Sequence, residues 1–92
     1  MSAAAIRERV DSEVEGVDSS AFGWDFRSCL LEVPELVQLK EHDGSMSPVW
    51  IVLRQPDGYS IVFDPGAEQF GLATGGTIVG IYGGFMDTLN AM

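Results

Sequence analysis

The sequence has few of the side chains that catalysis, metal binding and nucleic-acid binding require. Its 92 residues include one cysteine, one histidine and five lysine or arginine residues, against fourteen aspartate or glutamate residues. The single cysteine excludes a disulfide within the chain, and a short chain without disulfides is typical of a reducing compartment. Five scattered cations cannot form the basic patch that neutralises nucleic-acid phosphates or anionic lipids. We therefore expect neither direct nucleic-acid binding nor membrane binding.

Long apolar segments are also missing. Residues 1–16 contain no apolar run of signal-peptide length. The longest nearly apolar stretch, residues 49–53, is far too short to span a bilayer. Together with the single cysteine, these absences predict a cytoplasmic protein.

The isolated Cys29 and His42 give little support to catalysis. A nucleophilic cysteine needs an electropositive, partly exposed setting that lowers its pKa. Cys29 adjoins apolar residues in an acidic chain, so we interpret it as a buried structural thiol. Zinc sites gather three or four Cys, His or carboxylate ligands, and the group Glu41, His42 and Asp43 contains one histidine and no cysteine. We predict no catalytic residue, no metal site and no cofactor.

What the chain does have is enough apolar bulk for one core. Hydrophobic residues make up 46% of the sequence, including two Trp, five Phe and two Tyr. Acidic disordered tails lack this content. The length matches one domain, and neither a linker nor an internal repeat divides it. We therefore predict a single domain over residues 1–92.

An amphipathic helix is predicted at the N-terminus. Its apolar residues follow the i, i+3, i+4 spacing of one helix face: Ala3, Ile6, Val10, Val14 and Val17. Ser2 is a suitable N-cap and Gly16 a suitable end.

The charges on this helix are arranged against its dipole. Arg7 and Arg9 lie in the first half, whereas the acidic residues are concentrated toward the end. Each such effect costs about 0.3–1 kcal/mol, so packing can override it. Residues 1–43 carry ten acids and four bases, whereas residues 44–92 carry four and one. An acidic contact surface on the N-terminal half explains this distribution, and so does simple solubility.

The rest of the sequence predicts strands and turns. Residues 21–26 alternate aromatic side chains and indicate an extended segment, weakened by Gly23. Pro34 is expected to lie outside any strand, before a strand over residues 36–41. Residues 41–48 are predicted to form a polar loop.

Two hairpins and a terminal helix follow. Residues 49–55 and 59–64 flank a Pro-Asp-Gly turn, and residues 49–53 have the continuous apolar run of a strand covered on both faces. Residues 70–74 and 77–82 flank Gly75-Gly76, which suits a primed two-residue turn. Phe85, Leu89 and Met92 have helical spacing. The predicted fold is α+β, with an N-terminal helix, a four- to five-stranded mainly antiparallel sheet of hairpins, and a short C-terminal helix.

These features together predict a non-enzymatic interaction protein that binds and blocks a basic protein partner. In size, charge and lack of catalytic side chains the chain resembles bacterial immunity proteins, antitoxins and phage-encoded inhibitors. The predicted partner-binding residues are Glu8, Asp11, Glu13, Glu15, Asp18 and Trp24.

Two alternatives stay open. One is a ligand-binding or enzymatic module with a pocket lined by Trp24, Trp50 or Tyr59. The other is an accessory subunit that forms a homodimer through an exposed sheet edge or apolar patch.

Overall fold

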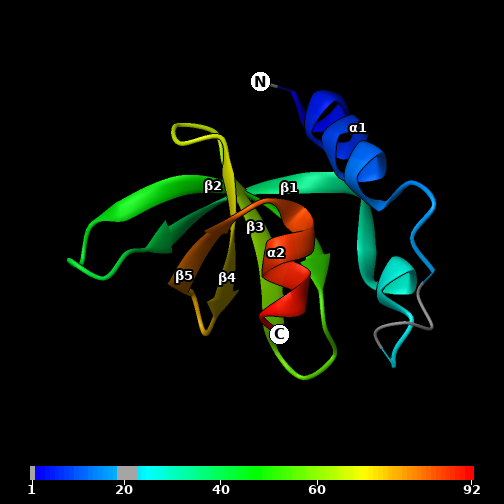
Figure 1. Cartoon of the computed structure of the whole chain (residues 1–92). Coiled ribbons are helices and arrows are strands. Elements are labelled where there is room, and N and C mark those ends of the chain that lie inside the picture. The colour runs from blue at the N-terminus through cyan, green and yellow to red at the C-terminus, as the bar shows by residue number, and fades with distance from the viewer. Residues whose placement is uncertain (1, 19–22) are drawn as a thin grey trace.

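The structure, a computed structural model, describes residues 2–18 and 23–92 and consists of two helices packed on a curled sheet (Figure 1). The elements are α1 (Ala3–Val14), the 3-10 helix η2 (Phe26–Cys29), β1 (Leu30–Lys40), β2 (Met46–Arg54), β3 (Tyr59–Asp64), β4 (Gln69–Thr74), β5 (Thr77–Gly83) and α2 (Phe85–Asn90). This order confirms the predicted α+β fold, with five strands between the two α-helices.

The five strands follow one another around the sheet as antiparallel neighbours. The sheet curls until β1 meets β5, which closes a small barrel through a single parallel pair, Lys40 and Thr77. The backbone N–H of Lys40 donates to the carbonyl of Gly76 at 3.0 Å beside this pair. Closure therefore rests on one end of β5.

The strands are covered on both faces by two apolar clusters. The larger cluster lies between the sheet and the helices and includes Phe63, Phe70 and Phe85. The smaller cluster draws on all five strands and lies within the curl; its buried members are Val49, Ile51, Val62, Ala73 and Ile78. Val49, Ile51, Val52 and Leu53 are all buried. Trp50 is half-buried. The predicted cover on both faces of residues 49–53 is therefore confirmed for every side chain except that of Trp50.

Both predicted hairpins are present, with the turn geometry that their glycines allow. Gly58 has a φ of 104° in the turn between β2 and β3. Gly75 and Gly76 have φ values of 59° and 79°, and positive φ at both central residues is the requirement of a type I′ turn.

Both predicted helices are also present. The Ser2 hydroxyl accepts a hydrogen bond from the backbone N–H of Ala5 at 3.2 Å, which caps α1. Three residues of the apolar stripe are buried: Ile6, Val10 and Val14. In α2, Phe85 and Leu89 are buried, whereas Met92 lies beyond the end of the helix.

The structure corrects two predictions between α1 and β2. Residues 23–26 are not a strand, because Gly23 takes a φ of 76° and Phe26 begins η2; residues 21 and 22 lie outside the described residues. Pro34 does not lie outside the strands, since it is part of the eleven-residue strand β1. The β1–β2 register shifts between Leu30 and Glu35. At such an irregularity the missing N–H of proline costs no ladder hydrogen bond.

The polar loop is shorter than predicted. Strand β2 already begins at Met46, so the connection between β1 and β2 spans residues 41–45. This extends the β1–β2 arm beyond the rest of the sheet (Figure 1).

Candidate functional site

The exposed face of α1 brings together three of the predicted partner-binding residues. Glu8 and Asp11 belong to α1 and Glu15 is its C-cap residue. All three are exposed, and their spacing of three and four residues places them on one side of the helix. They line a surface depression together with Ser12, Val14 and Arg27. The apolar stripe on the opposite side of α1 is buried, so these carboxylates project from a fixed helix.

Arg27 supplies the positive charge that the end of α1 lacks in its own sequence. One guanidinium nitrogen, Nη2, donates to the carbonyl of Val14 at 2.7 Å and also to the carbonyl of Val17. The guanidinium carbon lies 5.2 Å from the centre of the Phe26 ring. A cation on the last carbonyls of a helix offsets the dipole. The unfavourable charge order of α1 is therefore relieved by a residue of η2.

The two arginines of α1 leave part of its acidic face unpaired. Arg7 Nε contacts Asp11 Oδ1 at 2.9 Å. Arg9 does not pair within the helix, because its Nη1 lies 3.5 Å from Oε1 of Glu68. Exposed pairs of this kind contribute at most about 1 kcal/mol. Within the described part of the chain, Glu8 and Glu15 have no ion-pair partner.

Glu13 has an internal role that separates it from this face. Its Oε1 accepts a hydrogen bond from the backbone N–H of Phe85 at 2.8 Å. Phe85 is the first residue of α2, whose N-terminal N–H groups have no partner within the helix. The side chain of Glu13 therefore joins α1 to α2.

The remaining two predicted contact residues lie beyond α1. Asp18 is exposed and follows the end of the helix. Trp24 is half-buried and packs on the larger cluster, with its ring edge-to-face to Phe26 at 6.4 Å between centroids. Trp24 thus contributes to the core and presents only part of its ring to solvent.

The structure keeps the two candidate nucleophile and base residues of the sequence apart. Cys29 and His42 lie beyond opposite ends of the eleven-residue strand β1. Across residues 2–18 and 23–92, no group of three or more His, Cys, Asp or Glu side chains is placed to hold a metal ion. The pKa of Asp43 is lowered because the hydroxyl and the backbone N–H of Ser45 both donate to its carboxylate. That contact is a turn in the β1–β2 loop.

One cavity is lined by Tyr59, one of the three aromatic residues predicted to line a pocket. Tyr59 lines a cavity of about 270 Å³ beside α2, whereas Trp24 and Trp50 are not among its lining residues. The other lining side chains come from the turn before Tyr59, from β4 and from the C-terminus, so only the fold brings them together.

No protein-family model, no curated protein and no solved structure matches the chain significantly. Among the described helices, none has the length and apolar character that crossing a membrane would require.

Proposed function

We propose that the protein is a small acidic interaction module that binds a basic protein through the exposed face of α1. The observation that carries this proposal is the placement of Glu8, Asp11 and Glu15 on one side of a helix whose other side is buried. By covering a basic surface of its partner, the module blocks that surface. This action fits an inhibitor of the kind represented by immunity proteins, antitoxins and phage-encoded inhibitors.

The anchoring of α1 supports this proposal. The buried stripe and the hydrogen bond from Phe85 to Glu13 hold the inner side of the helix, and the contacts of Arg27 hold its C-terminal end. A preformed surface loses less conformational entropy on binding than a mobile one. The formal charge of -9 adds long-range attraction for a basic partner, which raises the association rate at low salt.

The cytoplasm is the proposed compartment. A single free cysteine, half-buried at the end of η2, is compatible with a reducing environment.

The chain offers a matched pair of variants for testing the α1 face. Glu8→Gln with Glu15→Gln removes two charges from the face, and Glu32→Gln with Glu41→Gln removes two charges from β1 and the loop after it. None of these four side chains makes an ion pair or side-chain hydrogen bond in the described structure. Both variants should therefore fold alike.

The experiment captures partners from lysate of the source cell with each variant, at low and at high salt. We expect the wild type and the Glu32/Glu41 variant to retain a basic protein at low salt and release it at high salt. The Glu8/Glu15 variant should retain much less of it. Equal retention by both variants would reject the α1 face as the binding surface.

A homodimer is the second candidate function, and β5 provides the observation that favours it. Val79, Ile81 and Tyr82 are at least 40% exposed, and β5 pairs with β1 at one position only. Residues 69–86 contain no charged side chain, so β4 and β5 would bring no like charges of their own into contact at this edge. Sedimentation over a range of concentrations tests it, since a monomer at every concentration would exclude the dimer.

A further inference from the structure

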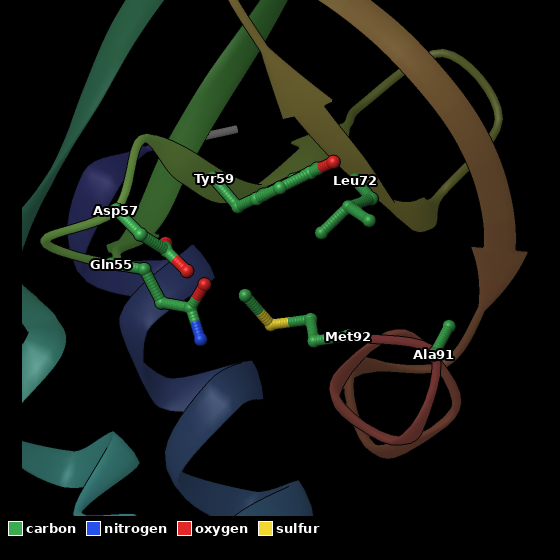
Figure 2. Close-up of a pocket in the computed structure, with 6 residues that line it drawn as sticks. All are labelled: Gln55, Asp57, Tyr59, Leu72, Ala91 and Met92. Carbon is green, nitrogen blue, oxygen red and sulfur yellow. The ribbon is translucent and has the colours of Figure 1, made fainter.

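The cavity beside α2 is built from three separate parts of the chain. Gln55 and Asp57 come from the turn after β2 and Tyr59 begins β3; the remaining lining residues are Leu72, Ala91 and Met92. Figure 2 shows the carboxamide of Gln55 and the carboxylate of Asp57 pointing toward the side chain of Met92. The volume of about 270 Å³ lies just below the range of roughly 300–1,000 Å³ typical of small-molecule sites. A cavity of this size suits a single side chain.

The walls of this cavity are held by backbone hydrogen bonds. Gln55 N–H donates to the carbonyl of Tyr59 at 2.8 Å, and Gly58 N–H donates to the carbonyl of Gln55 at 3.2 Å. The Thr74 hydroxyl donates to the carbonyl of Gly58 at 3.3 Å, which ties the turn to β4. On the opposite wall, Met92 N–H donates to the carbonyl of Leu89 at 3.3 Å. These bonds hold the backbone on both sides of the cavity in place.

The chemistry of the lining divides the cavity into an apolar and an acidic part. Leu72 is buried, and with Ala91 and Met92 it gives a hydrocarbon and thioether surface. Asp57 adds a carboxylate, Gln55 adds an amide oxygen, and Tyr59 adds an aromatic ring that can face a cation. No Lys or Arg is among the described lining residues, and in the described structure Asp57 has no ion-pair partner.

We propose that this cavity accepts a lysine or arginine side chain presented by a protein partner. The aliphatic stem lies against Leu72 and Met92, and the cationic head meets the Asp57 carboxylate and the Gln55 amide oxygen. Long basic side chains commonly bury their stems while their heads stay near solvent and polar groups. The inference rests on the proposed function, because it names a side chain through which a basic protein would be recognised.

The test needs no partner protein. N-acetyl-lysine amide and N-acetyl-arginine amide are titrated into the ¹⁵N-labelled protein, and backbone amide shifts are followed by NMR. N-acetyl-norleucine amide has the stem without the charge and is the control ligand. We expect saturable shifts at residues 55–59, 72, 91 and 92 with at least one of the charged ligands, and at least five-fold weaker binding of norleucine amide.

The variant Asp57→Asn should weaken binding of the charged ligand at least three-fold. Asp25→Asn removes the same charge elsewhere, from a side chain that makes no described hydrogen bond or ion pair, and should leave binding unchanged. Unfolding curves of both variants verify that each is folded. Shifts spread over the whole acidic surface, or equal weakening by both variants, would overturn the proposal.

A third ligand separates a protein side chain from a free cation. The diamine 1,5-diaminopentane lacks the backbone amides of the capped amino acids, and tighter binding of this diamine would assign the cavity to a free polyamine and overturn the proposal. If the cavity fails these tests while the Glu8/Glu15 variant still loses its partner, the proposed function stands without the cavity. If the cavity binds lysine amide and the α1 variant loses nothing, the α1 face is wrong and the cavity stands.

Discussion

The helix α1 and the uncharged segment 69–86 differ in charge, in glycine content and in how much room they leave for side chains. The twelve residues of α1 include five charged side chains and no glycine, whereas the segment, which contains β4 and β5, has no charge and six of the eleven glycines. In α1 the buried stripe fixes the helix and leaves the outer side chains to vary. In β4 and β5 the backbones approach so closely that single atoms matter. The comparison separates a surface whose side chains can change without disturbing the core from a scaffold that tolerates little change.

The largest loss of stability is expected from a substitution at Gly71 in β4. A Cβ atom at this position would lie 2.6 Å from the carbonyl oxygen of Gly80 and 2.6 Å from Cδ1 of Ile81. Because a backbone atom cannot give way cheaply, Gly71→Ala should lower the free energy of unfolding by about 2–3 kcal/mol. Urea unfolding measures this change.

Gly80→Ala is the matched control for that prediction. A Cβ atom there would meet the Tyr82 hydroxyl at 2.9 Å, and Tyr82 is exposed and free to turn away. Its cost should stay below about 1 kcal/mol. If Gly80→Ala were as destabilising as Gly71→Ala, the close contact with the Gly80 backbone would not be the reason.

A smaller effect is expected at Arg27, which supports the end of α1. Arg27→Ala removes the donor to the carbonyls of Val14 and Val17 and should cost about 1–2 kcal/mol, as charge-assisted hydrogen bonds do. Arg54→Ala breaks only an exposed pair with Glu35 and should cost less than about 0.5 kcal/mol. Equal losses in thermal or urea unfolding would show that Arg27 does not anchor the helix.

Within α1 itself, Glu13 and Glu8 should behave differently. Glu13→Ala leaves the N–H of Phe85 without its acceptor and should cost about 1 kcal/mol. The Glu8 side chain makes no hydrogen bond or ion pair in the described structure. Glu8→Ala should therefore change the free energy of unfolding by less than about 0.5 kcal/mol. Chemical denaturation of the two variants measures this difference. Equal losses of stability would show that Glu13 contributes no more to the fold than Glu8 does.

The smallest effect is expected at Asp43, outside both regions. Because Ser45 donates to the charged form, the pKa of Asp43 in the folded protein lies below its ordinary value of 3.8. The contribution to stability is therefore present above about pH 4 and is lost as the pH falls through the lowered pKa. An NMR titration should give a midpoint below 3.8 that rises toward 3.8 in Ser45→Ala. An unchanged midpoint in that variant would remove the Ser45 hydroxyl as a cause and leave only the backbone N–H.

The turns and helices could be predicted because their causes are local. The pair Gly75-Gly76 and the sequence Pro56-Asp57-Gly58 specify their turns through φ alone, and the apolar spacing of α1 specifies its buried face. The prediction that Pro34 lies outside the strands was wrong, because a proline fits a strand where the register is already irregular. That irregularity depends on how β1 follows β2 around the barrel, which no local pattern shows.

The candidate site could be predicted only in part, for a similar reason. The spacing of Glu8, Asp11 and Glu15 by three and four residues is a local pattern, which is enough to put them on one side of a helix. The contact from Phe85 to Glu13 joins residues 72 positions apart, and the support from Arg27 comes from η2, a 3-10 helix that the sequence did not predict. Both are consequences of packing, so the sequence indicated where the charge lies without showing which acids the fold itself uses.

The central claim is that the position of the acidic charge, and not its amount, determines binding. The most direct test is the Kd of the captured basic partner for the two double variants, measured by calorimetry at low salt. The Glu8/Glu15 variant should bind about tenfold more weakly than wild type, which is about 1.4 kcal/mol. The Glu32/Glu41 variant, with the same net charge, should stay within about twofold of wild type, a difference near 0.4 kcal/mol. Equal weakening of both variants would contradict the claim, because net charge alone would then account for the interaction.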